Sequence, residues 1–193
     1  MYKKHLLLLA ASATLLFSCQ KDDSLNPEEN NTKIIGTWTF VNMTAHTNAT
    51  ETATIDGDTY KSVTISDYTS TNNAGEITIS AGTFSTKDFT YTANTYAHVT
   101  TYVNGTLEDT LSQPIQFTAP VGSSNAPYKL IGSDSMYLSV GTVTTGTTTV
   151  PSTPAGFKYA WSGDTLLVTS IAVVPAGASY VGYSKQTMRY LRK

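Results

Sequence analysis

The sequence predicts an all-β fold made of hairpins of short antiparallel strands. Three observations predict it. Threonine is the commonest residue, tyrosine occurs 12 times and only 13% of the residues are charged, so hydroxyl groups supply much of the polarity. β-Branched and aromatic residues favour strands over helix interiors. Apolar residues alternate over short runs, and no run of a dozen residues keeps a helical spacing.

Residues 1–18 are interpreted as a signal peptide. Lys3 and Lys4 precede an apolar run from Leu6 to Phe17, which is too short for a permanent membrane span. The run ends just before Cys19, the only cysteine in the sequence. A lone cysteine excludes an internal disulfide and a thiolate metal cluster, so its position has to explain it.

Leu16-Phe17-Ser18-Cys19 resembles the lipobox of bacterial lipoproteins. The resemblance implies that Cys19 is acylated and becomes the mature N-terminus, so that the membrane is a partner through Cys19. Each acyl chain contributes roughly 0.8 kcal/mol per buried methylene, and stable attachment needs more than one chain. The alternative is an ordinary signal peptide that contains a cysteine by chance.

Residues 19–32 are expected to be the lipidated cysteine and a flexible tether. Gln20-Lys21-Asp22-Asp23 is similar to the acidic export signal of Bacteroidota lipoproteins. The resemblance implies anchoring in the outer membrane with the domain facing the cell exterior. The periplasmic face is the alternative, because any short hydrophilic linker has a similar composition.

Residues 33–193 have the length of one domain and contain the predicted strands. Turn signals such as Asp56-Gly57-Asp58, Asn72-Asn73-Ala74-Gly75, Asn104-Gly105 and Ser162-Gly163-Asp164 separate them. Two longer connections are expected, Ala119–Pro127 and the Thr-rich tract 141–156, which is left open as a hairpin, a lid or a flexible segment. The candidate strands are Ile34–Met43, Tyr60–Tyr68, Glu76–Ser80, Phe89–Thr92, Tyr96–Val103, Ser112–Thr118, Tyr128–Ile131, Ser135–Val140, Phe157–Trp161, Thr165–Val174 and Lys185–Leu191.

The first candidate strand contains Gly36-Thr37-Trp38, which resembles the Gly-x-Trp motif of the lipocalins and of the lipocalin-like lipoproteins of Bacteroidota. In that family the tryptophan closes one end of the barrel, beneath a basic residue of the last strand. The resemblance implies an antiparallel up-and-down β-barrel of about eight or more strands, with Gly36, Trp38 and Arg189 as the barrel-closing residues. Arg189 is preferred to Arg192, which is almost at the terminus. A guanidinium over an indole contributes roughly 0.5–2 kcal/mol.

No catalytic constellation is recognised. His46 and His98, the histidines beyond the predicted signal peptide, lack carboxylates or a second histidine at metal-ligand spacing. The sequence also lacks the Gly-x-Ser-x-Gly elbow of acyl-transfer enzymes. We therefore expect no enzyme activity, no cofactor and no metal. A formal net charge of −2 without a Lys/Arg cluster argues against nucleic acid as a partner.

Two functions remain open: a binding module for a small hydrophobic ligand, and a structural or interaction subunit. An eight-stranded barrel either holds one small apolar ligand or is filled by its own side chains. For the first function, the candidate ligand-binding residues are Phe40, Tyr159 and Trp161, and the partner is a small hydrophobic ligand. The second is a packed structural or accessory subunit, with a fimbrillin-like sandwich as the rival fold. Such a subunit would bind an outer-membrane protein or a glycan through its loops.

Overall fold

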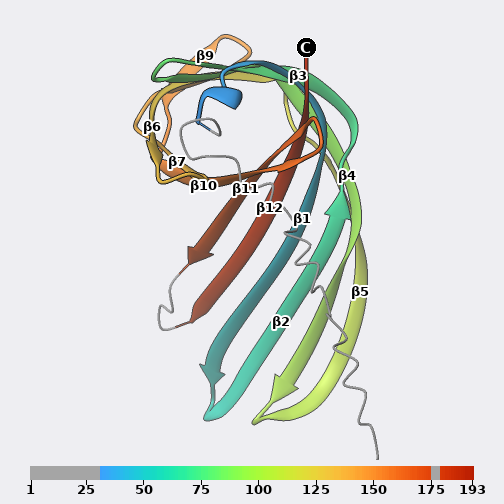
Figure 1. Ribbon diagram of the computed structural model, residues 1–193. Helices are drawn as coiled ribbons and strands as arrows, with labels where there is room; N and C mark the ends of the chain where they lie inside the picture. The colour runs from blue at the N-terminus through green and yellow to red at the C-terminus, as the bar shows by residue number, and fades with distance from the viewer. Residues whose placement is uncertain (1–30, 175–178) are drawn as a thin grey trace, which may run out of the picture.

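A computed structural model describes residues 31–174 and 179–193 of the chain (Figure 1). The predicted fold class is confirmed, because the described residues form one antiparallel sheet of 12 strands, with only a helical turn at 31–33. The predicted signal peptide, Cys19 and most of the predicted tether lie outside the described residues. The strands are β1 (Gly36–Ile55), β2 (Asp58–Thr69), β3 (Thr71–Ser80), β4 (Thr83–Val103), β5 (Thr106–Thr118), β6 (Gly122–Ile131), β7 (Ser135–Leu138), β8 (Thr142–Thr145), β9 (Thr148–Pro151), β10 (Ala155–Ser162), β11 (Thr165–Val174) and β12 (Tyr180–Arg192).

Part of this sheet closes into a ring. In chain order the ring strands are β1, β3, β4, β6, β7, β10, β11 and β12. Each pairs antiparallel with the next, and β12 pairs with β1. The strands β2, β5, β8 and β9 are insertions between ring strands. Without them, each ring strand pairs with the strands before and after it in the chain, which is the topology of an up-and-down barrel. A closed wall of this kind leaves no exposed sheet edge.

Two inserted strands build an extension of the barrel. β1, with 20 residues, and β4, with 21, both run beyond the ring. β2 pairs with the far halves of both, and β5 pairs with β4. With the adjoining parts of β11 and β12, these strands form a sheet in the order β5-β4-β2-β1-β12-β11, which projects from the ring in Figure 1. We call this sheet the extension.

Tight turns close the long hairpins of the extension, as the sequence predicts. Asp56 and Gly57 join β1 to β2 with φ values of 53° and 91°. Asn104 and Gly105 join β4 to β5 with φ values of 50° and 83°. Positive φ at both central residues is the geometry of a type I′ turn, which Asn, Asp and Gly adopt most readily.

The turn predicted at 72–75 is wrong. β3 begins at Thr71 and runs through this stretch, with register irregularities against β4. At Gly75 the backbones of β3 and β4 come close together. Only glycine fits there, because a Cβ would lie 2.6 Å from the Cα of Phe89. The candidate strands at 89–92 and 96–103 are likewise one strand, β4, and the connection predicted at 119–127 ends where β6 begins at Gly122.

The Thr-rich tract is a hairpin, β8–β9, one of the alternatives left open by the sequence. β8 continues the line of β7 along β6, so the hairpin adds to the barrel wall. The chain passes β6 closely at Gly141, where a Cβ would lie 2.7 Å from the Cα of Ala126. The hairpin is tied back by the Ser152 hydroxyl, which accepts from the backbone N–H of Gly141 at 2.9 Å.

The core lies inside the ring. Trp38, Phe40 and Met43 are the inward side chains of β1, and an irregularity between Phe40 and Asn42 moves the inward position by one residue. Burying each such side chain contributes roughly 1.5–3 kcal/mol to the free energy of unfolding. Further buried residues of this core are Ile34, Ile77, Ile79, Phe84, Met136, Leu138, Tyr159, Leu166, Val168 and Tyr190.

Candidate functional site

One end of the barrel, which we call the base, is closed around Trp38. The Trp38 side chain is 1% exposed, and its indole N–H donates to the carbonyl of Ile34 at 2.9 Å. The guanidinium carbon of Arg192 lies 4.6 Å from the centroid of the Trp38 ring, and the centroid of the Trp161 ring lies 5.5 Å from it. Arg192 also donates to the carbonyl of Lys33 at 2.6 Å, which ties β12 to the start of the barrel.

Gly36 makes room for this arrangement. Its φ of +144° lies in the region that favours glycine. A Cβ at Gly36 would lie 3.6 Å from the guanidinium of Arg192, so a larger side chain would compete with the arginine for its place over the indole. The residues of the Gly-x-Trp motif and a basic residue of the last strand therefore meet at the base.

The basic residue is Arg192, and the prediction of Arg189 is wrong. Arg192 lies directly opposite Trp38 in the β1–β12 ladder, whereas Arg189 lies opposite Asn42. Side chains alternate along a strand, so the buried Tyr190 places Arg192 on the inward face and Arg189 on the outward face. Arg192 does not fray, because its guanidinium is held by two backbone carbonyls.

Two of the three candidate ligand-binding residues, Phe40 and Tyr159, fill the barrel, and Trp161 is half-buried at the base. Phe40 is 3% exposed and packs on Phe89, with ring centroids 4.4 Å apart. The buried Tyr159 donates its hydroxyl hydrogen to Asn31 at 2.7 Å. Trp161 packs on Trp38 at the base, beneath the ammonium group of Lys33. None of Phe40, Tyr159 and Trp161 borders the cavity described next, so its lining gives no support to their assignment as ligand-binding residues, and Trp161 instead lines a separate hollow at the base.

A cavity inside the barrel, open to the exterior, has a volume of about 350 Å³ and lies beyond the side chains that fill the base. In the β1–β12 ladder Arg192 lies opposite Trp38, and Met188 lies opposite Met43. The cavity is bordered by Met188 and not by Trp38 or Arg192, so it lies away from the base. A volume of this size is at the lower end of the range for small-molecule sites.

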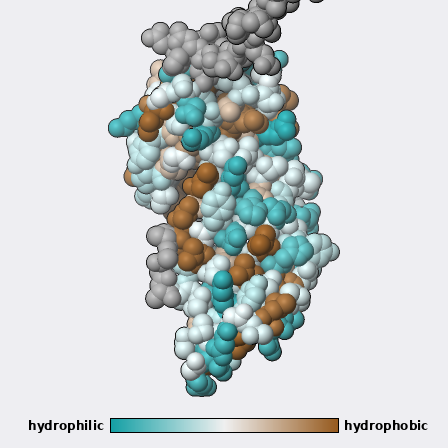
Figure 2. All heavy atoms as spheres, turned by 60° about the horizontal axis from the view of Figure 1, so that its bottom comes forward, coloured by the Kyte–Doolittle hydropathy of each residue, from teal (hydrophilic) through white to brown (hydrophobic). Residues whose placement is uncertain are grey.

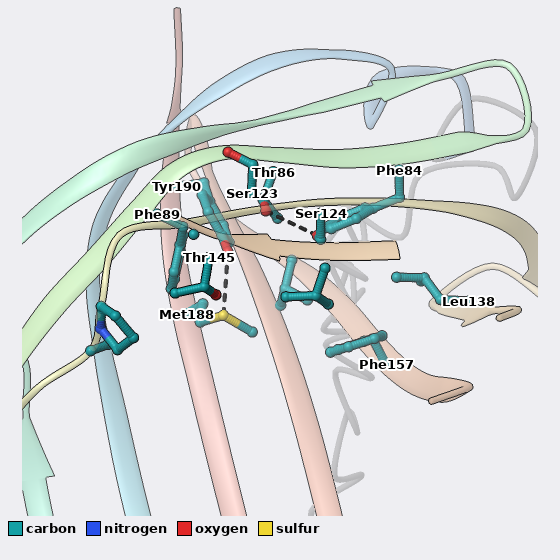
Figure 3. Close-up of a pocket in the computed structure, with 15 residues that line it drawn as sticks. Phe84, Thr86, Phe89, Ser123, Ser124, Leu138, Thr145, Phe157, Met188 and Tyr190 are labelled. Atoms are coloured by element: carbon teal, nitrogen blue, oxygen red, sulfur yellow. Dashed lines mark hydrogen bonds between the residues drawn. The ribbon is translucent and has the colours of Figure 1, made fainter. Parts of the chain in front are cut away.

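The two sides of the cavity differ in chemistry, as Figure 3 shows. One side comes from β4, β6 and β8, where the hydroxyl groups of Thr86, Ser124 and Thr145 lie among the apolar side chains of Phe84, Phe89 and Val143. The other comes from β7, β10, β11 and β12 and presents Leu138, Phe157, Val168 and Met188. The cavity thus combines an apolar surface with a few polar groups on one wall, which is typical of ligand sites.

Tyr190 is a further polar group at the cavity. Its hydroxyl donates to the thioether sulfur of Met188 at 3.3 Å. Burial raises the pKa of Tyr190 well above its ordinary value of 10, because a phenolate would be poorly solvated there. The phenol is therefore neutral at physiological pH, and it adds no charge to the cavity.

His46 and His98 lie on the extension and do not border the cavity. The Nδ1 atom of His46 is 2.7 Å from a carboxylate oxygen of Asp67, and that of His98 is 2.9 Å from the hydroxyl of Ser112. Within the described residues, no group of three or more His, Cys, Asp or Glu side chains is placed to hold a metal ion. No helix of the described part of the chain has the length and apolar character needed to cross a membrane.

The sequence analysis did not identify the hydroxyl groups of Thr86, Ser124 and Thr145 as part of a site. Alternation along β4 places Phe84 and Thr86 on the same face, a pattern visible in the sequence. What could not be seen is that β8 pairs with β6, which brings Thr145 to the same wall as Ser124.

No family model matches the chain, and no match was found among curated proteins or solved structures.

Proposed function

We propose that this protein is a lipid-anchored, lipocalin-like lipoprotein of the outer membrane that binds a small hydrophobic ligand without catalysis. The observation that carries the proposal is the open cavity of about 350 Å³ inside the barrel, with Phe157, Val168 and Met188 on its apolar side. Burying an apolar ligand against such side chains is favourable by roughly 25 cal/mol per Å² of area removed from water.

The geometry of the base supports the resemblance to the lipocalins. Gly36, Trp38 and Arg192 make the contacts that the family uses to close its barrel, with the guanidinium 4.6 Å from the indole centroid. The ring of neighbouring antiparallel strands supports it as well. The arrangement leaves the opposite end of the barrel available for a ligand.

The proposed membrane anchor would lie at the base, at the end of the barrel opposite the open cavity. Asn31, the first described residue, bonds to Tyr159 inside the barrel, and the next residues pack at the base beside Trp38 and Arg192. A tether that begins at Cys19 would therefore join the domain near the base. The cavity would then be reached from the side away from the tether, as a carrier or sensor on the cell exterior requires.

Binding of a neutral fluorescent dye tests the proposal. The full chain with Cys19→Ala removes the proposed acylation site and allows assay without detergent. We expect it to enhance the fluorescence of Nile red in a saturable way, and Val143→Trp, which places a large ring on the β8 wall, to abolish the enhancement. Equal enhancement by both proteins, or none by either, would contradict the proposal.

A second candidate is a structural or interaction subunit that binds a protein or glycan. Apolar side chains of the extension favour it, since Tyr96 is 56%, Ile171 54% and Val173 62% exposed. Figure 2 shows apolar side chains in small groups among polar ones, which is weaker than the contiguous patch of a stable interface. Photo-crosslinking from position 173 in intact cells distinguishes this candidate, because a partner of defined mass would support it.

A further inference from the structure

The hydroxyl groups of the cavity are placed by strand register. Ser124 lies opposite Thr86 of β4 on one side and opposite Val143 of β8 on the other. Paired residues of an antiparallel ladder share a face, so all three side chains point to the same side of the wall. Thr145, two residues beyond Val143, lies on that face near the mouth and is exposed.

Thr86 and Ser124 retain hydrogen-bonding capacity. Their hydroxyl oxygens are 2.9 Å apart, so one hydroxyl donates to the other. That bond uses one of the two hydroxyl hydrogens, and the second hydrogen and several lone pairs stay available. Figure 3 shows this pair on one side of the cavity and Phe157 on the other. A ligand that reaches the pair can therefore both accept from it and donate to it.

The described residues that line the cavity provide no charged side chain that could pair with an ionic group of a ligand. Among these described residues, none is Lys, Arg, His, Asp or Glu. The arginine nearest in sequence, Arg189, lies on the outward face of β12. A carboxylate or ammonium group moved into such surroundings loses its hydration without gaining a partner of opposite charge, whereas a neutral hydroxyl loses much less.

The volume limits the part of a ligand that the barrel can enclose, because the cavity is open to solvent. At roughly 30 Å³ for each water-sized group, about 350 Å³ holds on the order of a dozen non-hydrogen atoms. The apolar side, with Leu138, Phe157 and Val168, suits a short hydrocarbon chain or a small ring. The hydroxyl pair suits one polar group at the end of that chain or ring.

We propose that the cavity selects an uncharged amphiphile of about this size, with an apolar body against Phe157 and Val168 and one hydroxyl or carbonyl group at the Thr86–Ser124 pair. This inference rests on the proposed function and specifies the class of its ligand. It excludes free fatty acids in their ionised form, although their chains would fit the same surface.

Three compounds that differ in their head group provide the test. 1-Octanol, octanoate and octylammonium are used to displace Nile red from the full chain with Cys19→Ala at neutral pH. We expect octanol to bind and the two ions to bind more weakly by at least about tenfold, because each must lose its hydration. Octanoate should gain affinity as the pH is lowered towards about 4, where a carboxyl becomes neutral, while octanol should not.

A matched pair of variants locates the head group. The double substitution Thr86→Val and Ser124→Ala removes the hydroxyl pair in the cavity, and Thr144→Val with Thr149→Val removes a pair with the same 2.9 Å spacing outside it. We expect the first double variant to weaken octanol binding about fivefold, as for one lost hydrogen bond. The second should leave binding unchanged.

These experiments distinguish a failure of the neutral-ligand inference from a failure of the proposed binding function. Octanoate binding as tightly as octanol at neutral pH, or equal effects of the two double variants, would overturn the neutral-ligand inference and leave the carrier function standing. Failure of Nile red and of all three octyl compounds to bind would overturn both. Thermal unfolding of each variant checks that a loss of binding reflects the cavity and not the loss of the fold.

Discussion

At the scale of single residues, the closing of the barrel depends on a contact between a cation and an indole. Arg192 lies over Trp38 and donates to the carbonyls of Lys33 and Ile35, so one guanidinium joins the last strand to the first. Gly36, whose φ of +144° favours glycine, lies beside the guanidinium, which a Cβ there would approach to 3.6 Å. The contact links the two ends of the barrel domain, so it should contribute to global stability.

Arg192→Ala is therefore expected to lower the free energy of unfolding by about 2–3 kcal/mol, from the lost cation–π contact and charge-assisted hydrogen bonds. Arg189→Ala is the matched control, because its side chain faces outward, and it should cost less than about 0.5 kcal/mol. Urea unfolding followed by tryptophan fluorescence measures both. A larger loss from Arg189→Ala would reverse the assignment.

Two tyrosines make stability depend on pH in the alkaline range. Burial raises the pKa of Tyr68 to about 12, with a further contribution from nearby Tyr91, and burial raises that of Tyr190 still further. In the unfolded chain these phenols ionise near pH 10, so the native state holds more protons above that pH. The contribution of these two tyrosines to the free energy of unfolding is present in full below pH 10. It is lost as the pH rises through their pKa values in the folded state.

We expect unfolding to become easier from about pH 10 upward. Tyr190→Phe, which keeps the ring and removes the ionisable group, should flatten this dependence. Circular dichroism and phenolate absorbance, followed together from pH 9 to 12, measure the two effects. If all tyrosines ionise near pH 10 while the fold stays intact, the raised pKa values are refuted.

At the scale of elements, the inserted strands decide the shape of the site. The alternating pattern and turn residues predicted most strands, and the type I′ turns of the extension followed from Asp-Gly and Asn-Gly. The pairing partners could not be predicted, because register is set by contacts between distant segments. This is why the sequence left the Thr-rich tract open, although its β8 strand builds part of the cavity wall.

Gly141 tests the role of the β8–β9 hairpin. Gly141→Ala would bring a methyl group to 2.7 Å from the Cα of Ala126, so β8 must shift from β6. We expect a loss of about 1–3 kcal/mol in stability and weaker Nile red binding. Gly156→Ala is the control, because a Cβ there meets no atom within 4 Å. Unchanged dye binding in Gly141→Ala would show that β8 is not needed for the cavity.

At the scale of the whole molecule, the barrel has a filled base, an open cavity and a projecting extension. Composition alone predicted the all-β class, and the Gly-x-Trp motif located the base. The large aromatic residues Phe40, Tyr159 and Trp161 suggested a ligand site, but Phe40 and Tyr159 are buried in the core and Trp161 packs on Trp38 at the base. The cavity is lined by Phe84, Phe89 and Phe157 together with small hydroxyl residues, and which of these side chains meet depends on strand pairing that the sequence does not show.

The proposed anchor gives a prediction at this scale. Wild-type protein should incorporate labelled fatty acid in cells and partition into detergent, because acyl chains supply its membrane affinity. Cys19→Ala should abolish the label and release the protein to the aqueous phase. Cys19→Ser, which keeps a residue of nearly the same size, serves as a second variant and should behave in the same way. Wild-type protein without label would refute the anchor.

The most direct test of the central claim uses the methionine methyl groups. Met188 borders the cavity, whereas Met136 is buried and does not. With methyl-labelled methionine in the full chain carrying Cys19→Ala, titration with 1-octanol should move the NMR signal of Met188 in a saturable way and leave that of Met136 nearly in place. A Met188 signal that does not respond, at concentrations that saturate the displacement of Nile red, would contradict a ligand site inside the barrel.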